Sequence, residues 1–208
     1  YLISKGKEVI FDAEHFFDGY KNNPEYAVEG LLAAAKGGSE TLVLCDTNGG
    51  CFPEEIEKIT RNVLHKVMLE YPRIKIGIHV HNDMSFAVIN SIKAVEAGAT
   101  HIQGTLIGFG ERCGNANLST IIANLQLKKG IKILEEEKIE QLTQFSRAVA
   151  EIANITIDDG MPYVGQNAFA HKGGMHIDGV TKASHSFEHI SPTKVGNERE
   201  FLLSEVSG

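Results

Sequence analysis

The sequence predicts an α/β fold in which parallel strands alternate with helices, and three observations predict it. Four short runs are rich in β-branched residues and bounded by Gly, Asp or Asn, as strands are. Segments with helical spacing of apolar residues lie between these runs. Two stretches, AAAKGGSETLVL and KAVEAGATHIQG, each pass from a helix end through glycine into a strand. Because neighbouring parallel strands need a long crossover, this alternation predicts a parallel sheet covered by helices.

The expected elements follow one another along the first half of the chain. Strands are expected over residues 8–16, 41–45, 74–81 and 101–108. The first helix should begin at Asn23-Pro24, where a capping residue precedes a proline, and should end at Gly37. A second helix is expected from Pro53 towards Tyr71, because its apolar residues recur at helical spacing. A third is expected over residues 85–98.

Polar residues that could take part in catalysis or ligand binding recur about once in each strand-helix unit. They stand at or just beyond the expected C-terminal ends of the strands: Glu14, Thr47, His79, His81 and Asn115. An open doubly wound sheet binds its ligand at a single switch point, whereas a barrel collects residues from several strand ends. This distribution favours a barrel. A TIM (β/α)8 barrel has eight strands and about 250 residues, so residues 1–130 are expected to be its C-terminal half, with strands 5–8.

The pattern changes after residue 130. An acidic helical segment, EEEKIEQLTQFSRAVAEIAN, carries apolar residues on one face and is followed by the glycine-rich stretch MPYVGQNAFAHKGGMHIDGVTKA. Residues 131–208 are therefore expected to form a mainly helical linker subdomain beyond the barrel.

Composition excludes several classes of partner. The chain has 208 residues, 42% of them hydrophobic, and a formal net charge of -7 without a run of lysines or arginines. This leaves no basic surface for nucleic acid or an anionic membrane. No apolar stretch approaches the roughly 20 residues needed to cross a bilayer, and no signal peptide is visible. Three cysteines without zinc-ribbon spacing indicate a reducing, cytoplasmic location.

The stretch IHVHND is the first candidate for chemistry. On a strand, His79 and His81 would point to the same face, which suits binding of one metal ion. The alternative is that one histidine binds a backbone carbonyl while the other is solvated. Asn115 could add an amide oxygen, and such a donor set favours Mn, Mg or Zn. Asp83 could orient a ligand histidine or form a salt bridge, and spacing does not decide between these roles.

Three other candidates have plain structural alternatives. Asp46-Thr47-Asn48-Gly49-Gly50 could bind a carboxylate, although an ordinary turn explains it as well. Glu14 could simply be solvated at a strand end. Cys113 lacks an evident base and is expected to be a small buried residue.

Longer motifs resemble a known family. The run HVHNDMSFAVINSIKAVEAGATHIQGTLIGFGERCGNANL resembles the second signature of the 2-isopropylmalate, homocitrate and citramalate synthases, which are metal-dependent Claisen-condensing barrels. DAEHFFDGYKNNPEYA, LVLCDTNGG, AFAHKGGMHIDGV and FEHISPTKVGNER are most similar to the citramalate synthases of that family. The resemblance covers essentially the whole chain.

The resemblance implies an acyltransferase that joins acetyl-CoA to pyruvate and releases CoA, giving (R)-citramalate for isoleucine synthesis. A 2-isopropylmalate synthase of leucine biosynthesis is the alternative within the family. A divalent metal ion and a homodimer are implied as well. His79 and His81 would bind the metal with Asn115 close by or coordinated. Thr47 would hold the carboxylate of the 2-oxo acid, and Glu14 and His176 would serve the proton transfers.

The sequence departs from the family in two places. The Asp-Arg-Glu motif of the first strand, which supplies an acidic metal ligand, does not occur in this sequence, and neither does a C-terminal regulatory domain. Phe187 stands where relatives commonly have tyrosine. The N-terminal half barrel is expected to lie outside these residues, and the isolated chain is expected to be inactive. A non-catalytic half-barrel interaction module is the alternative from a different class.

Overall fold

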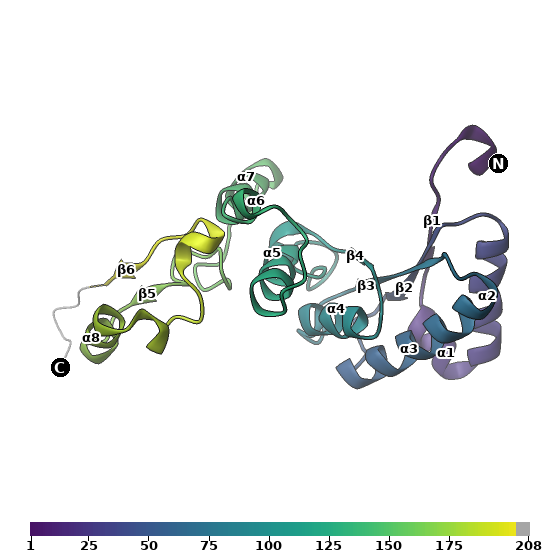
Figure 1. Ribbon diagram of the computed structural model, residues 1–208, viewed down its shortest axis with the longest axis horizontal. Coiled ribbons are helices and arrows are strands. Elements are labelled where there is room, and N and C mark those ends of the chain that lie inside the picture. The colour runs from purple at the N-terminus through teal and green to yellow at the C-terminus, as the bar shows by residue number, and fades with distance from the viewer. Residues whose placement is uncertain (203–208) are drawn as a thin grey trace. The chain divides into compact units, whose positions relative to one another are not determined.

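The structure is a computed structural model that describes residues 1–202, and the chain divides into two compact units, residues 1–118 and 119–208. The first unit alternates strands and helices (Figure 1). Its elements are β1 (Ile10–Ala13), α1 (Phe16–Asn22), α2 (Pro24–Lys36), β2 (Thr41–Asp46), α3 (Pro53–Glu70), β3 (Lys75–Val80), α4 (Ala87–Glu96) and β4 (His101–Gln103), preceded by a 3-10 turn at Ile3–Lys5.

The four strands form one parallel sheet in the order β1-β2-β3-β4. β1 and β4 are therefore its two edges, which a flat sheet would hold about 14 Å apart at a spacing of about 4.8 Å per strand. Yet the Gln103 side chain on β4 donates a hydrogen bond of 2.9 Å to the Asp12 carboxylate on β1. The sheet is curled, and these side chains meet on its concave side. The α/β fold with a partial barrel is confirmed, while the assignment to strands 5–8 stays a prediction.

The helices of the first unit pack along the sheet as the sequence predicts (Figure 1). α2 begins at the expected Asn23, whose side chain accepts a 3.2 Å hydrogen bond from the backbone of Tyr26. α3 begins at Pro53, and the Glu55 carboxylate accepts a 2.8 Å hydrogen bond from the backbone N–H of Phe52. Each contact satisfies an N–H that the first helical turn cannot pair.

The core lies between the helices and the two central strands. The buried side chains of β2, β3 and α3 include Leu42, Val43, Leu44, Ile76, Ile78, Ile56, Val63 and Val67. All six residues of β2 are buried, and its apolar run over residues 42–45 is typical of a strand in a parallel sheet. The edge strand β1 is more open, with Ile10 44% and Phe11 37% exposed. The residues that follow β2 and β3 therefore extend from the buried centre of the sheet.

Two boundaries differ from the expected ones. The strand expected over residues 101–108 ends at Gln103, and Leu106–Gly108 forms a 3-10 turn in which Ile107 has a φ of 61°. The strand expected over residues 8–16 ends at Ala13. It is followed by α1, which buries Phe16 and Phe17. In both places the apolar side chains pack from a turn or helix, which composition alone does not distinguish from a strand.

The second unit is mainly helical. It contains most of α5 (Leu118–Ala123), a π-helical turn (Asn124–Lys128), α6 (Glu136–Ile139), α7 (Leu142–Ala153), β5 (Ala170–His171), α8 (Gly174–Lys182), 3-10 turns at Ser184–Ser186 and Pro192–Val195, and β6 (Glu200–Phe201). β5 and β6 pair as a small parallel sheet. The division into functional domains at 130/131 stays a prediction, and the last six residues of the range 131–208 lie outside the described residues.

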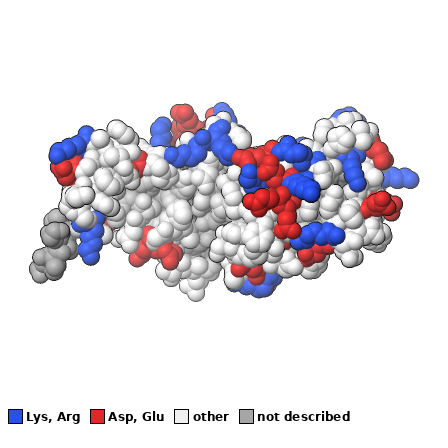
Figure 2. Space-filling model, turned by 90° about the horizontal axis from the view of Figure 1, so that it is seen from below, with Lys and Arg blue, Asp and Glu red and all other residues white. Residues whose placement is uncertain are grey.

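The surface carries both signs of charge. On the face seen in Figure 2, lysine and arginine side chains alternate with aspartate and glutamate side chains. Several pairs lie along α3 and α4, where Glu57 contacts both Arg61 and Lys93. Across residues 1–202, none of the helices combines the length and the apolar character that a bilayer crossing requires.

Candidate functional site

The candidate site lies at the C-terminal ends of the strands of the first unit. Five of the six residues proposed from the sequence gather there. Glu14 follows β1, Thr47 follows β2, His79 lies in β3, His81 follows it, and Asn115 lies in the loop after β4. The parallel register brings these ends to one edge of the sheet, because His79 pairs with Cys45 on one side and Gln103 on the other.

The two histidines face each other through the same ring atom. Nε2 of His79 lies 3.2 Å from Nε2 of His81. Two imidazoles that bind one ion at about 2.1 Å each place their nitrogens about 3.0–3.4 Å apart, so this spacing fits adjacent metal ligands. Burial and the neighbouring His79 and Arg112 lower the pKa of His81. A lowered pKa favours the neutral imidazole, which is the form that binds metal.

Asn115 contributes an oxygen without a partner. Its backbone bridges to His81, and its Nδ2 donates a 3.3 Å hydrogen bond to the carbonyl of Phe109. Its Oδ1 and the Nδ1 of His81 are buried side-chain atoms without a hydrogen-bond partner. Buried polar atoms are nearly always paired, so an unpaired amide oxygen on the residue that bridges to His81 is a candidate ligand atom.

The donors fit part of a metal site. Two imidazole nitrogens and an amide oxygen suit Mn, Mg or Zn. Within residues 1–202, no group of three or more His, Cys, Asp and Glu side chains could hold a metal ion. His79, His81 and Asn115 would therefore supply only part of the ligands that a metal ion needs.

Glu14 and Thr47 form a direct pair. The Thr47 hydroxyl donates a 2.7 Å hydrogen bond to the Glu14 carboxylate and accepts a 2.8 Å bond from the backbone N–H of His15. His15 adopts a φ of 55°, which turns this N–H towards Thr47 at the start of α1. In this state the hydrogen of the Thr47 hydroxyl is committed to Glu14. Binding of a substrate carboxylate by Thr47 requires that this hydrogen turn away from Glu14.

Asp83 forms a salt bridge and does not orient a ligand histidine. Arg112 donates two hydrogen bonds of 2.7 and 2.9 Å to its carboxylate and a third of 2.9 Å to the carbonyl of Thr47. These hydrogen bonds hold the pKa of Asp83 below its usual range. Gly49, at a φ of 64°, permits the close approach of the two loops, because a Cβ there would lie 2.7 Å from the Asp83 carboxylate. The loops after β2, β3 and β4 are thereby joined.

Two of the three cysteines, Cys45 and Cys51, are buried and poorly suited to act as nucleophiles. Burial, with the charges of Glu14 and Asp12 adding to it, raises the pKa of Cys45 to about 12. Burial also raises the pKa of Cys51 to about 12. Such thiols stay protonated at neutral pH. Cys113 is exposed, so the expectation that it is buried was wrong.

Three residues of the site were not singled out from the sequence. Asp12, Gln103 and Arg112 each make side-chain hydrogen bonds within it. A polar residue at the end of an apolar strand is the available signal for Asp12 and Gln103. Their partners depend on the strand register and on the curl of the sheet, which the sequence pattern does not give.

The sixth proposed residue, His176, belongs to the second unit. It lies on α8 in an exposed position, and its ring stacks on Phe187 with a centroid distance of 4.5 Å and an interplanar angle of 26°. Gly179, one turn further along α8, makes room for this ring, because a Cβ there would lie 2.4 Å from Phe187. The contacts that bring together the other five residues do not include His176.

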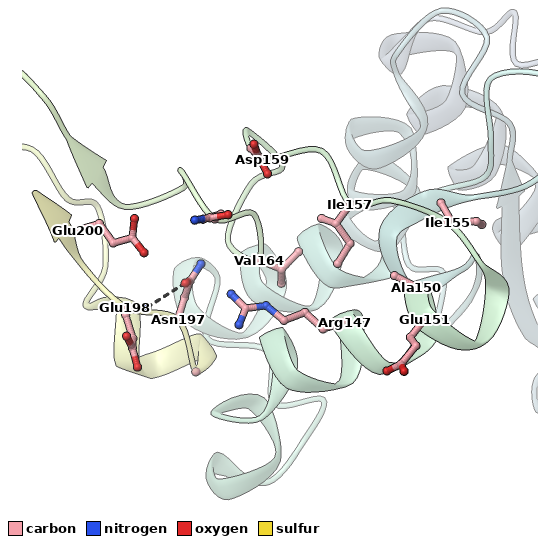
Figure 3. Close-up of a pocket in the computed structure, with 12 residues that line it drawn as sticks. Arg147, Ala150, Glu151, Ile155, Ile157, Asp159, Val164, Asn197, Glu198 and Glu200 are labelled. Atoms are coloured by element: carbon pink, nitrogen blue, oxygen red, sulfur yellow. Dashed lines mark hydrogen bonds between the residues drawn. The ribbon is translucent and has the colours of Figure 1, made fainter. Parts of the chain in front are cut away.

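None of the six residues lines the pocket of the second unit that Figure 3 shows. Arg147 and Glu151 on α7, Asp159, Glu198 and Glu200 line it together with apolar residues such as Ile157 and Val164. Its acidic side chains outnumber its single arginine. This pocket offers neither a nucleophile nor a metal-ligating histidine.

The first unit is a partial barrel with two histidines facing each other at its strand ends. Residues 2–149 match the model of the HMGL-like family, and residues 163–208 match the model described as homocitrate synthase post-HMGL domain-like. The chain therefore belongs to the HMGL-like family. The resemblance expected from the sequence motifs is confirmed.

Curated relatives sharpen this assignment. The chain is 52% identical to (R)-citramalate synthases from a Synechocystis strain and from Aquifex aeolicus, in each case over its whole length. It is 33% identical over 97% of its length to a 2-isopropylmalate synthase from Methylacidiphilum infernorum. The chain spans 39% of the length of the two citramalate synthases.

A solved structure supports the fold. The structure of an HMG-CoA lyase from Acinetobacter baumannii in complex with coenzyme A and 3-methylmalate matches 69% of this chain and 45% of that protein. The TM-score is 0.52 at 24% sequence identity. At this identity the match bears on the fold alone.

Proposed function

We propose that this chain is part of an acyltransferase that condenses acetyl-CoA with pyruvate and water to give (R)-citramalate and CoA. The observation that supports this most is the 52% identity to (R)-citramalate synthases across all 208 residues. The cofactor of the proposed enzyme is a divalent ion, Mn, Mg or Zn. A homodimer and a cytoplasmic location stay predictions.

The proposed reaction has a simple balance. A base removes a proton from the methyl group of acetyl-CoA, and the resulting carbanion forms a carbon–carbon bond with the 2-oxo carbon of pyruvate. The 2-oxo oxygen then takes up a proton. Water cleaves the thioester, and CoA leaves as the thiol. The methyl proton is very weakly acidic, so a positioned general base is essential.

The residues of the chain are proposed to share these tasks. His79, His81 and Asn115 would hold the divalent ion. A bound ion supplies Lewis acidity that polarises the 2-oxo group and stabilises the negative charge that develops on its oxygen. Thr47 binds the carboxylate of the 2-oxo acid with its hydroxyl. Glu14 and His176 carry the protons, and the Glu14 carboxylate becomes available when the Thr47 hydroxyl, 2.7 Å away, turns its hydrogen to the substrate.

The test uses the protein encoded by the whole reading frame that contains these residues. Release of CoA thiol from acetyl-CoA is measured with added Mn²⁺ and with pyruvate, 3-methyl-2-oxobutanoate or 2-oxoglutarate. The proposal expects release with pyruvate at a rate well above that with the other two acids.

The other outcomes separate the alternatives. Preference for 3-methyl-2-oxobutanoate would assign the protein as a 2-isopropylmalate synthase and overturn the citramalate proposal. A folded protein that releases no thiol with any of the three acids would favour the non-catalytic interaction module.

A further inference from the structure

We infer that Gln103 is a positioning residue that fixes the tautomer of His79, and that Asp12 fixes the orientation of Gln103 in turn. The inference rests on the proposed metal-dependent function, because it explains how the Nε2 atom of His79 is kept free of a hydrogen for the metal ion. The inference is based on two consecutive hydrogen bonds, which link Asp12 to Gln103 and Gln103 to His79.

The hydrogen bond between His79 and Gln103 follows from the register of β3 and β4. His79 on β3 and Gln103 on β4 are paired directly in the parallel ladder, so their side chains leave the sheet on the same face. The Nδ1 atom of His79 lies 2.9 Å from the Oε1 atom of Gln103. Both residues are half-buried, so a lost hydrogen bond there is only partly replaced by water.

The hydrogen bond between Gln103 and Asp12 forms because the sheet is curled. The Nε2 atom of Gln103 donates a 2.9 Å hydrogen bond to Oδ1 of Asp12 on the opposite edge strand. An ionised carboxylate only accepts hydrogen bonds, so the amide nitrogen of Gln103 must face Asp12. The amide oxygen must then face His79.

The orientation of the amide determines the proton on His79. An amide oxygen only accepts, so the hydrogen between Gln103 and His79 belongs to Nδ1 of the imidazole. A neutral imidazole with a hydrogen on Nδ1 has a bare Nε2. That bare nitrogen is the atom that faces Nε2 of His81 at 3.2 Å. A metal-ligating histidine commonly donates its other N–H to such an acceptor, which fixes its tautomer and ring orientation.

A purely structural role is the competing explanation. The Asp12–Gln103 contact joins the two edges of the curled sheet, and it could serve only to hold that curvature. The two roles differ in what they fix, because a structural role does not require a particular tautomer of His79. The tautomer is therefore the decisive readout, and it needs neither metal nor substrate.

The experiment uses the full-length protein with ¹⁵N-labelled histidine, prepared free of metal. Long-range ¹H–¹⁵N correlation spectra report which ring nitrogen of each histidine carries the hydrogen. His79 is identified through the missing signals of His79→Ala. The inference expects the hydrogen on Nδ1 in the wild type, and the affinity for Mn²⁺ is measured on the same samples.

Three variants sharpen the test. Gln103→Leu removes the acceptor, so a population with the hydrogen on Nε2 should appear and the dissociation constant for Mn²⁺ should rise about 10- to 100-fold. The double variant Asp12→Asn/Gln103→Glu keeps an acceptor for Nδ1 and moves the donor of the second hydrogen bond to position 12, so it should retain both the tautomer and most of the affinity. Asp12→Asn lets the Gln103 amide turn over and should weaken the tautomer preference. This variant carries the test if Gln103→Leu does not fold.

Two results would overturn the inference: a wild-type His79 with its hydrogen on Nε2, or an unchanged tautomer in folded Gln103→Leu and Asp12→Asn. Failure of the proposed function is a different result. In that case the tautomers would follow the expectation while the wild type released no CoA thiol with any 2-oxo acid.

Discussion

The two units hold their candidate residues in different ways. In the first unit, five candidates lie at or beyond the C-terminal ends of the strands of one parallel sheet, and hydrogen bonds join Glu14 to Thr47 and His79 to His81. In the second unit, His176 lies on an exposed helix, where its ring contact is with Phe187. The first arrangement suits groups whose geometry must be fixed to within a fraction of an ångström, such as metal ligands. The second suits a group that moves a proton.

This comparison predicts that substitutions in the two units affect turnover and metal binding differently. His176→Ala in the full-length protein should lower kcat by about 100- to 10,000-fold, the usual contribution of a general acid or base. Binding of Mn²⁺ should be unchanged. Thiol release and metal titration measure the two quantities. His185→Ala, which alters another exposed histidine of the second unit, is the matched control and should leave both unaffected. A loss of metal binding in His176→Ala would contradict the division of roles.

A smaller effect is expected at Thr47. Thr47→Val keeps the shape of the side chain but removes the hydroxyl that bonds Glu14 and the His15 backbone. A hydrogen bond to a charged group contributes about 1.5–3 kcal/mol, so kcat/KM for the 2-oxo acid should fall about 10- to 100-fold. Steady-state kinetics with Thr47→Ser as the control measures this. Equal losses in the Ser and Val variants would show that the hydroxyl is not the relevant group.

The second unit also contains a buried ionic cluster whose role is structural. Glu188 is 6% exposed and accepts hydrogen bonds from Arg199, both of 2.6 Å, and contacts His171 at 3.1 Å. These contacts, led by the hydrogen bonds from Arg199, lower the pKa of Glu188. Glu188→Gln should therefore reduce the free energy of unfolding by about 2 kcal/mol at neutral pH. Denaturant titration of the full-length protein measures this change.

The pH dependence follows from the same shift. A carboxyl whose pKa is lower in the folded state stabilises the fold above its unfolded pKa, about 4.3, and this contribution is lost as the pH falls below that value. The wild type should lose stability in this range more steeply than Glu188→Gln. Parallel pH profiles of the two proteins would refute the role of this cluster.

The smallest effect is expected at the ring that contacts His176. Phe187→Leu removes the stacked aromatic pair, which contributes about 0.5–1.5 kcal/mol. The corresponding loss in kcat is about 2- to 10-fold, and Phe187→Tyr, which keeps a ring, should retain most of the activity. Steady-state thiol release compares the variants. A loss in Phe187→Leu as large as that in His176→Ala would mean that the ring does more than position the imidazole.

The sequence predicted those features that depend on neighbours along the chain. The N-terminal cap at Asn23, the helix beginning at Pro53 and the buried strand from Thr41 all follow from local patterns. The grouping of Glu14, Thr47, His79, His81 and Asn115 followed from the rule that parallel strands end at one edge. Each of these inferences requires only spacing and composition.

The remaining features depend on contacts between distant segments. The Gln103–Asp12 hydrogen bond joins residues 91 positions apart and exists only because the sheet is curled. The pairing of Arg112 with Asp83 likewise required the geometry of two loops, and the sequence left two roles open for Asp83. Phe187 lies against His176 because Gly179 leaves space on α8. No periodicity in the chain reports these contacts.

We propose that the strand ends of the first unit hold a divalent ion. The most direct measurement is a titration of the metal-free, full-length protein with Mn²⁺, followed by electron paramagnetic resonance, for the wild type and three alanine variants. The account predicts one site per chain in the wild type and in His65→Ala, which alters an exposed histidine on α3. That site should be lost in His79→Ala and in His81→Ala. Binding of Mn²⁺ with unchanged affinity in both of these variants would contradict the account.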